Sequence, residues 1–473
     1  MKTIVVGAGG GGIASALLSS LRNEEVTLIE AHENLGGCAS WFKRGAFCFD
    51  AGATTLSGLA PHEPMGKLCA LIKDSPSVHI ADPGIVFHLS SGKKLHYYKD
   101  FDRWMKELER EFPDLKHRAF WKKIYAINDK AWGLLANLNS FPFQEFHQVW
   151  EALKAPELYP LYPYLVISTD MMVKFYGLHH PEYLELLNGI LLISAQAEAE
   201  EIPFLVGAMA LAYPRETYAP VGGMKGLMDF FETKCLESGI TLLKKSPVQK
   251  ISSTQVLLKN NQELSADRII LNVPYWNISS LFSGKEKVVI DQELKDPKHA
   301  WGAFTLYLGI KGEFKELYQQ IHLNHPLVKN YFVSFSLPED LSRAPTGWQA
   351  VTISTHVEVG DWFECEKDVY QARKQEMLDL ILNDFKQRFS ISETKFVTTG
   401  TPKTFERFTG RKSGYVGGLP FLFGMNPWKI QGHTTKLSHV YRVGDTTFPG
   451  QGLVGVVAGA MALDQTLKKE HLH

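Results

Sequence analysis

The order of apolar and polar positions predicts alternating strands and helices near both ends of this chain. An apolar run at 3–6 is typical of a buried strand, and residues 13–22 repeat their apolar positions at helical spacing. A second apolar run at 26–29 predicts a second strand. Near the carboxyl end, the pattern predicts a strand at 440–443 and a helix at 453–463. Both ends of the chain are therefore expected to be α/β.

The predicted secondary structure changes twice in the middle of the chain. Residues from about 100 to 215 read as mostly helical and carry many aromatic side chains. From Val221 onward a helix is expected after Gly222-Gly223-Met224, and apolar alternation then predicts further strands. These strands are expected at 239–243, 247–251, 255–258, 268–273, 303–307 and 350–354, before a helix at 369–389.

Glycines follow the first strand in the pattern Gly-x-Gly-x-x-Gly. The run Gly7-Ala8-Gly9-Gly10-Gly11-Gly12 satisfies it through Gly7, Gly9 and Gly12. Such a turn lets the amide groups and positive dipole end of the next helix face a pyrophosphate. Glu30 ends the second strand, where a carboxylate accepts hydrogen bonds from an adenine-linked ribose. The alternative is a glycine-rich turn beside an ordinary exposed glutamate, but the strand–loop–helix–strand–acid order favours a dinucleotide site.

A second glycine-rich segment, Gly444 to Gly452, lies between the last strand and the last helix. Asp445 is either a helix-start residue or a group that accepts hydrogen bonds from the ribityl hydroxyls of a flavin. The dipole of the helix at 453–463 would then point toward the pyrimidine edge of the flavin. A nicotinamide cofactor does not need this second segment, whereas a flavin must be held beyond its pyrophosphate. The two segments together therefore favour FAD.

Several motifs occur in the order found in one flavoprotein family. They are Gly7 to Gly12, Glu30, Gly36-Gly37-Cys38-Ala39-Ser40, Phe49 to Thr55, Val221 to Met224 and Gly444 to Gly452. The chain resembles the FAD-dependent phytoene desaturase, carotenoid isomerase and retinol saturase family, a branch of the amine-oxidase-like flavoproteins. The first fifty-five residues and the last thirty match closely, and the middle matches only in outline. The motifs are specific for the family and not for a substrate.

The resemblance implies a set of contacts with FAD. The glycine loop would bind the pyrophosphate, Glu30 the adenosine ribose, and the backbone of Val248 the adenine. Thr54 and Thr55 would approach the flavin, and Asp445 the region of its ribityl chain and phosphate. The implied cofactor-binding residues are Gly7, Gly9, Gly10, Gly11, Gly12, Glu30, Gly37, Cys38, Ala39, Ser40, Thr54, Thr55, Val248, Asp445, Leu453 and Val454.

The expected fold class is α/β: an interrupted Rossmann-like FAD-binding domain, a mixed β-sheet substrate domain and a helical cap. The expected ranges are 1–60, 222–290 and 430–473 for the FAD-binding domain, 61–100 and 291–429 for the sheet domain, and 101–221 for the cap. The cap is either an ordinary subdomain whose aromatics fill its core or a membrane-facing lid or tunnel for a long apolar substrate. In the second case, residues 202–213 would form a tunnel wall.

The resemblance further implies an FAD-dependent oxidoreductase that acts on a long apolar polyene, carotenoid-like or retinoid-like. Hydride chemistry at flavin N5 would desaturate, saturate or isomerise the polyene, and the sequence leaves these three reactions open. Desaturation would need an electron acceptor such as oxygen or a quinone. The alternatives are a flavin amine oxidase and a non-catalytic escort or binding protein with the flavin fold. No catalytic side chain is identified, although His62 and Glu63 follow the segment expected at the flavin.

Composition limits which binding partners and which cellular compartment are expected for this protein. Fifty Lys and Arg residues balance fifty-one Asp and Glu residues, so no net field favours nucleic acid. Five scattered cysteines without a Cys-x-x-Cys pair argue against a disulfide framework and a metal site, and Cys38 is interpreted as a packed residue. No signal peptide is expected before the first strand, and the longest apolar stretches are too short to cross a bilayer. A cytoplasmic protein is expected, with peripheral membrane contact left open.

Overall fold

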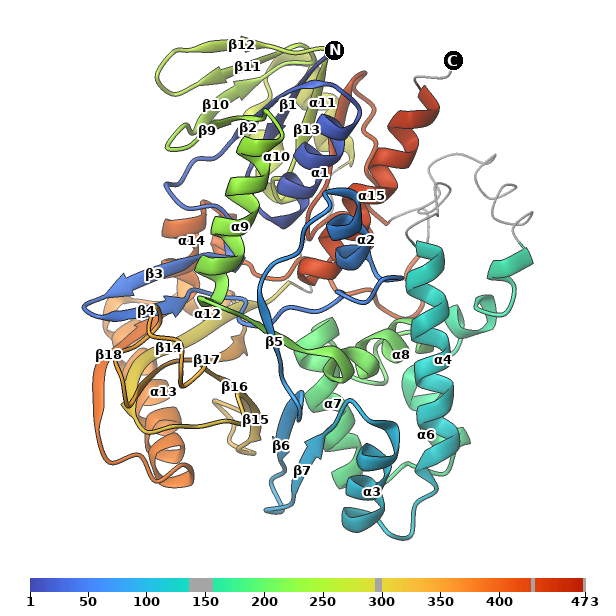
Figure 1. Ribbon diagram of the computed structural model, residues 1–473, viewed down its shortest axis with the longest axis vertical. Helices are drawn as coiled ribbons and strands as arrows, with labels where there is room; N and C mark the ends of the chain where they lie inside the picture. The colour runs from blue at the N-terminus through green and yellow to red at the C-terminus, as the bar shows by residue number, and fades with distance from the viewer. Residues whose placement is uncertain (136–155, 294–299, 427–429, 471–473) are drawn as a thin grey trace.

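The computed structural model describes residues 1–135, 156–293, 300–426 and 430–470 (Figure 1). Residues 136–155 of the predicted cap therefore lie outside the described part. Figure 1 shows a sheet with its helices near the amino terminus, a second sheet at the lower left and a group of helices at the lower right. These three regions correspond to the predicted fold class, which the structure confirms.

A five-stranded parallel sheet carries the glycine loop. Its strands, in spatial order, are β19 (Val440–Arg442), β13 (Arg268–Leu271), β1 (Lys2–Val6), β2 (Glu25–Ile29) and β9 (Thr241–Leu243). Helix α1 (Gly10–Leu21) connects β1 to β2 and packs against α9 (Gly223–Glu237) and α15 (Gly452–Glu470). The apolar positions Ile13 and Leu17 of α1 are buried in this core. Strands from both ends and the middle of the chain thus form one Rossmann-like sheet.

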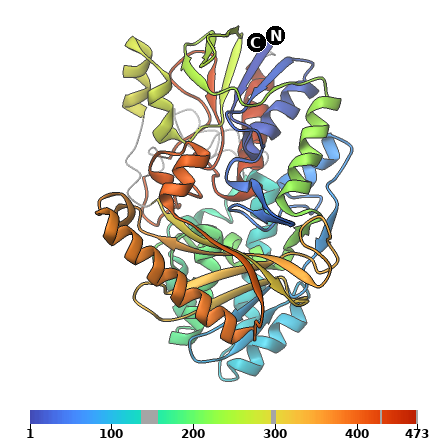
Figure 2. The same ribbon diagram turned by 90° about the vertical axis from the view of Figure 1, so that its left-hand side faces the viewer.

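A seven-stranded mixed sheet forms the second region. In spatial order its strands are β18 (Thr394–Gly400), β14 (Gly302–Lys311), β17 (Trp348–Val357), β16 (Asn330–Phe335), β15 (Tyr318–His322), β6 (Ile85–His88) and β7 (Lys94–Tyr97). The pair β15–β6 is parallel and the other neighbours are antiparallel. Helix α13 (Lys367–Arg388) lies across the outer face, where Phe304, Ile353 and Phe385 form a buried core (Figure 2). Because side chains alternate along a strand, the inner face carries a different set of residues.

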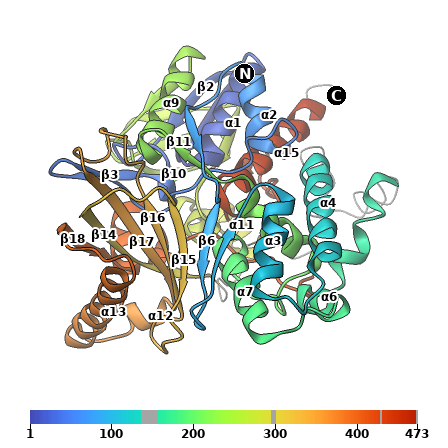
Figure 3. The ribbon, with the colours of Figure 1, turned by 60° about the horizontal axis from the view of Figure 1, so that its bottom comes forward.

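The helical cap packs against β6 and β7 (Figure 3). Its helices are α3 (Phe101–Glu111), α4 (His117–Leu135), α6 (Thr169–Phe175), α7 (Pro181–Ala195) and α8 (Phe204–Ala212). Trp104 and Trp121 are fully buried, and the ring of Tyr97 from β7 stacks on Trp104 with a centroid distance of 4.3 Å. Many of the predicted aromatic residues therefore fill the core of the cap.

Shorter elements complete the structure. They are the hairpin β3 (Trp41–Arg44) and β4 (Phe47–Asp50), the pair β5 (Val78–Ile80) and β8 (Tyr218–Pro220), the sheet β10 (Val248–Ile251), β11 (Gln255–Leu258) and β12 (Glu263–Ser265), and helices α2 (Pro64–Leu71), α10 (Tyr275–Ile278), α11 (Gly284–Glu293), α12 (Gly360–Phe363) and α14 (Pro402–Thr409). A capping box between Thr401 and Thr404 begins α14. Within the described ranges, every helix is too short or too polar to cross a membrane.

Candidate functional site

The glycine loop makes a tight turn between β1 and α1. Gly7 has a φ of +96°, and a Cβ atom at Gly12 would lie 2.0 Å from the carbonyl oxygen of Gly7. Glycine is required at both positions, because one needs a left-handed backbone and the other a close backbone approach. Helix α1 begins at Gly10 without a side-chain cap and without an acidic residue in its first turn. Its amide groups and positive dipole end are therefore suited to an anion.

The two glycine-rich segments meet in space. A Cβ atom at Gly11 would lie 3.1 Å from the backbone nitrogen of Gly444. Asn272 lies between the segments, and its Nδ2 donates to the carbonyl of Gly7 at 3.1 Å. Sequence reasoning missed Asn272, although its place directly after β13 was a signal, since ligands of parallel sheets bind at the carboxyl ends of the strands.

Glu30 follows β2, and its carboxylate turns back toward the glycine loop. Oε2 accepts a hydrogen bond from the amide of Ala8 at 2.8 Å, and Oε1 accepts one from the amide of His32 at 2.9 Å. Burial raises the pKa of the Glu30 carboxyl, and the two amide hydrogen bonds oppose that shift. Glu30 therefore stabilises the conformation of the loop and also lines the cavity next to it.

A cavity of about 1490 Å³ is lined by the glycine loop, the inner face of the mixed sheet and part of the cap. Small-molecule sites are typically about 300–1,000 Å³, so this cavity has room for a dinucleotide and a second molecule. The predicted cofactor residues that line it are Gly7, Gly9, Gly10, Gly11, Glu30, Gly37, Cys38, Ala39, Ser40, Thr54, Thr55, Val248, Asp445, Leu453 and Val454. Gly12, the remaining member of the predicted set, packs against Gly7 instead.

An ion pair that the sequence did not predict holds Asp445. Its Oδ2 lies 2.9 Å from Nη1 of Arg411, whose side chain is 10% exposed and lines the cavity. Burial acts to lower the pKa of Arg411, but the Asp445 carboxylate outweighs it and keeps the guanidinium charged. Nη2 of Arg411 is buried and has no hydrogen-bond partner among the described residues. That nitrogen is therefore suited to an acceptor on a bound molecule.

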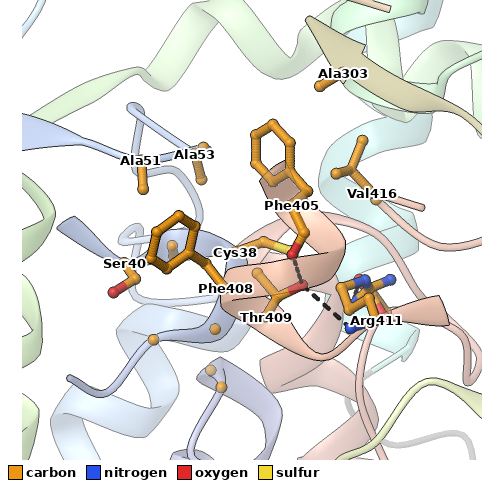
Figure 4. Close-up of a pocket in the computed structure, with 18 of the residues that line it drawn as sticks. Cys38, Ser40, Ala51, Ala53, Ala303, Phe405, Phe408, Thr409, Arg411 and Val416 are labelled. Carbon is orange, nitrogen blue, oxygen red and sulfur yellow. Dashed lines mark hydrogen bonds and ion pairs between the residues drawn. The ribbon is translucent and has the colours of Figure 1, made fainter. Parts of the chain in front are cut away.

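Helix α14 supplies further residues that sequence reasoning missed. Phe405 and Phe408 project from it beside Cys38 (Figure 4). Thr409 Oγ1 donates to the carbonyl of Phe405 at 2.6 Å and accepts from the amide of Arg411 at 3.3 Å. Burial raises the pKa of the Cys38 thiol, which keeps that thiol in its less reactive neutral form. Cys38 is partly exposed and lines the cavity, so its interpretation as a packed residue stays a prediction.

Thr54 and Thr55 connect the loop region to the sheet and the cap. Thr54 Oγ1 lies 2.6 Å from the Oγ of Ser334, and the hydroxyl of Tyr318 donates to the carbonyl of Thr54 at 3.1 Å. The hydroxyl of Thr55 forms a hydrogen bond with that of Tyr213. The two threonines therefore lie where the three regions meet.

The cap contributes a limited wall to the cavity. Its described lining residues are Leu192, Ile193, Ser194, Gln196 and Tyr213. Tyr213 is the member of the segment 202–213 that lines the main cavity, and the role of this segment as a tunnel wall stays a prediction. The last turn of α7 forms the rest of the described cap wall, because most of α8 is buried in the core of the cap.

His62 and Glu63 do not line the main cavity. His62 is exposed, and Glu63 is buried beside a small second cavity that shares Tyr213 and Val454 with the main one. Burial raises the pKa of Glu63 to about 7, and the carboxylate of Glu216 adds to this effect. Glu63 is thus a neutral buried acid at slightly acidic pH.

Glu63 is expected to make the fold less stable as the pH rises from 4.5 to about 7. Its pKa of about 7 exceeds the ordinary value of 4.5, so the folded state binds more protons than the unfolded state between these values. Stability therefore falls as pH rises through this window. Glu63→Gln should raise the free energy of unfolding by about 1 kcal/mol at pH 5 and about 3 kcal/mol at pH 8. Denaturant unfolding measures both values, with the exposed Glu358→Gln as the control, and an equal gain at both pH values would contradict the prediction.

The fold and the cavity define the class of protein. A discontinuous Rossmann-like domain holds a glycine turn with an acid at the end of the next strand, as in dinucleotide-binding oxidoreductases. Residues 5–70 match the family model of the NAD(P)-binding Rossmann-like domain. The second part of the cavity lies between the mixed sheet and the cap.

Known proteins resemble the chain over nearly its full length. It is 24% identical over 493 residues to the chloroplastic prolycopene isomerase of Arabidopsis thaliana, covering 96% of this chain and 80% of that protein. It is 21% identical over 535 residues to a 4,4'-diapophytoene desaturase (4,4'-diapolycopene-forming) of Methylomonas sp, covering 99% and 95%. A solved oxidoreductase structure from Methanosarcina mazei has a TM-score of 0.64 at 17% identity, covering 98% and 99%. The predicted resemblance is confirmed: the chain is similar over nearly its full length to a carotenoid isomerase and a carotenoid desaturase.

Proposed function

We propose that this protein is an FAD-dependent oxidoreductase that acts on a long apolar polyene of the carotenoid or retinoid kind. The observation that supports this most directly is a single cavity that joins the glycine loop to a second compartment between the sheet and the cap. A dinucleotide along the loop leaves that compartment for a substrate. The relatives act on prolycopene and on diapophytoene, which favours a polyene over an amine.

The residues of the cavity fit FAD. The uncapped amino end of α1 suits a pyrophosphate, and the carboxylate of Glu30 would accept hydrogen bonds from the hydroxyls of an adenosine ribose. The unpartnered Nη2 of Arg411 is suited to an acceptor atom of the cofactor. Leu453 and Val454 at the start of α15 offer an apolar surface to the flavin ring. We propose that the other predicted cofactor residues that line this cavity also contact FAD.

The side chains of this chain position the substrate and exclude water. Bound FAD supplies hydride transfer at its N5 atom. Ile193 and Phe332 provide apolar contacts in the second compartment, and Tyr213 closes it toward the small cavity beside Glu63. Desaturation consumes an acceptor such as oxygen or a quinone, whereas cis–trans isomerisation has no net redox change.

The test is conversion of polyenes by the flavin-loaded protein. Desaturation lengthens the conjugated system of the polyene and reduces the flavin under anaerobic conditions. Saturation requires prereduced flavin and shortens the conjugated system. Isomerisation changes the polyene spectrum and leaves the flavin state unchanged. A protein that takes up no FAD would refute the cofactor assignment. A flavoprotein that oxidises amines would support the amine oxidase alternative, and one that turns over neither class would support the escort alternative.

We also propose that one end of the cap contacts a membrane that contains the apolar substrate. Val166 is 72% exposed and Phe175 is 78% exposed, and Met171 between them is 53% exposed. These large apolar side chains come from α6 and the turn before it. Grouped exposed apolar residues are typical of an interaction surface.

Removing two of these side chains is expected to weaken binding to phosphatidylcholine vesicles. The double variant Val166→Ser/Phe175→Ser should bind about a hundredfold more weakly in co-sedimentation, since each buried apolar side chain contributes at least roughly 1.5 kcal/mol and about 1.4 kcal/mol corresponds to tenfold. The control is Val288→Ser/Leu341→Ser, which changes two apolar residues elsewhere that are 56% and 65% exposed. Equal loss in both double variants would contradict a specific membrane face.

A further inference from the structure

The main cavity reaches the molecular surface between β3 and α14. Lys43 and Arg44 of β3 line the cavity and are exposed. The same is true of Arg407 and Phe408 of α14. Figure 1 shows β3, β18 and α14 on the left of the molecule, whereas α6 of the cap lies on the right. This opening, called the basic mouth below, is therefore separate from the surface that we assign to membrane contact.

The basic mouth concentrates positive charge in a protein whose formal net charge is −1. Lys43 and Arg44 contribute two cations from the hairpin. The segment 395–412 contains one acidic residue, Glu406, and five basic residues, which are Lys395, Lys403, Arg407, Arg411 and Lys412. Among the described residues, Lys43, Arg44 and Arg407 form no ion pair with a carboxylate. Uncompensated charges of one sign attract a partner of the opposite sign.

Exposed apolar side chains lie on the same elements as these cations. Phe408 of α14 is 59% exposed, and Phe396 and Val397 of β18 are 49% and 39% exposed. A Cβ atom at Gly45 would lie 2.8 Å from Cζ of Phe396, so the tip of the hairpin touches β18. The guanidinium of Arg407 lies 5.5 Å from the ring centroid of Phe408. Exposed aromatic and arginine side chains together are typical of a surface that binds another macromolecule.

The cavity wall on this side is unsuited to a long apolar substrate. Hydroxyl groups of β18 and α14 line it, from Thr398, Thr399 and Thr404. On the side of the cap, by contrast, the last turn of α7 supplies apolar side chains. Phe408 projects from α14 beside Cys38, which belongs to the segment assigned to the cofactor (Figure 4). The basic mouth therefore leads to the cofactor by a polar route, apart from the compartment assigned to the polyene.

An acidic electron-transfer protein fits these features. Desaturation and saturation both require electrons to leave or reach the flavin. Electron-transfer complexes bury small interfaces, and complementary charge steers their encounter. A membrane fits less well here, because the exposed apolar side chains of α6 lie on the other side of the molecule.

We propose that the basic mouth, formed by Lys43, Arg44, Arg407 and Phe408, docks an acidic protein that carries single electrons to or from the bound flavin. This inference rests on the proposed function. Full reduction of the flavin consumes two electrons from two reduced carrier molecules and two protons from solvent. Reoxidation by two oxidised carrier molecules releases the same electrons and protons.

The test uses an acidic plant-type [2Fe–2S] ferredoxin, a strong reductant, and the flavin-loaded protein under anaerobic conditions. Stopped-flow absorbance measures flavin reduction by reduced ferredoxin, and calorimetry measures binding of oxidised ferredoxin. The triple variant Lys43→Gln/Arg44→Gln/Arg407→Gln should lower the second-order rate constant about tenfold to a hundredfold at low ionic strength and should weaken binding. Added salt should slow the wild type much more than the triple variant.

Lys73→Gln/Lys116→Gln/Lys329→Gln is the matched control, because it removes three exposed positive charges elsewhere. It should leave the rate constant and the binding affinity close to those of the wild type. FAD content should be unchanged in both triple variants. Equal rates in the two variants, or a wild-type rate that does not depend on salt, would overturn the inference.

Two further outcomes would also overturn it and assign the cations another role. Loss of FAD from the triple variant of the mouth would place these cations in the cofactor site. Binding of phosphatidylserine vesicles that the triple variant loses, without binding of ferredoxin, would assign the mouth to a membrane. These results leave polyene conversion, and with it the proposed function, standing. A wild-type protein that takes up no FAD would overturn both.

Discussion

Glu30→Ala is expected to weaken FAD retention by about tenfold or more. The substitution removes the acceptors for the amides of Ala8 and His32, at 2.8 and 2.9 Å, together with the proposed ribose contact. Hydrogen bonds to a charged group contribute about 1.5–3 kcal/mol each, so the loss of one already corresponds to about tenfold. Titration of the apoprotein with FAD, followed by flavin fluorescence, measures the change in affinity.

Two further variants test whether the loss of FAD affinity in Glu30→Ala is specific to this carboxylate. Glu30→Gln keeps one acceptor oxygen and should give an intermediate affinity. Glu25→Ala changes an exposed glutamate at the other end of β2 and should leave FAD affinity unchanged. An unaltered affinity in Glu30→Ala would refute the role of this carboxylate in the site.

Arg411→Met is expected to lower the free energy of unfolding by about 3 kcal/mol and to weaken FAD binding. It leaves the largely buried carboxylate of Asp445 without its counter-ion, which lies 2.9 Å away in the native protein. Breaking one partner of a buried ion pair typically costs about 3–5 kcal/mol, and the partial exposure of Asp445 places this pair at the lower end. Denaturant unfolding of the apoprotein measures the loss of stability apart from cofactor binding.

The double variant Arg411→Met/Asp445→Asn provides the decisive comparison. It removes both charges, so it should recover much of the stability that Arg411→Met loses. FAD affinity should stay low in the double variant, because the proposed contact from Arg411 is still missing. Lys412→Met removes a neighbouring exposed charge and should change neither property. A double variant no more stable than Arg411→Met would show that the ion pair is not the cause.

The sequence could predict those parts of the site whose conformation depends on residues close together in the chain. The clash that a side chain at Gly12 would make with Gly7 involves residues five positions apart, so the glycine pattern itself carries the information. The strand–helix–strand order around the loop is likewise visible in the apolar periodicity. Asn272 and Arg411 follow no such local pattern. Their importance depends on contacts with Gly7 and Asp445, which are distant in the chain.

The aromatic residues of the cap show the same distinction. Trp104 and Tyr213 are both typical of an apolar region, yet Trp104 is buried in the cap and Tyr213 lines the cavity. Periodicity indicates that a face is buried, but it does not say whether that face meets another helix or a bound molecule.

The sequence by itself determined the glycine turn, the acid at the end of the second strand and the membership of both chain ends in one α/β domain. These features follow from backbone sterics and from periodicity over a few residues. Tertiary structure alone decided that Arg411 pairs with Asp445 and that the amide oxygens of Gln196 and Gln320 remain without partners among the described residues. The physical reason is that hydrogen bonding and burial of a side chain depend on which distant segments pack around it.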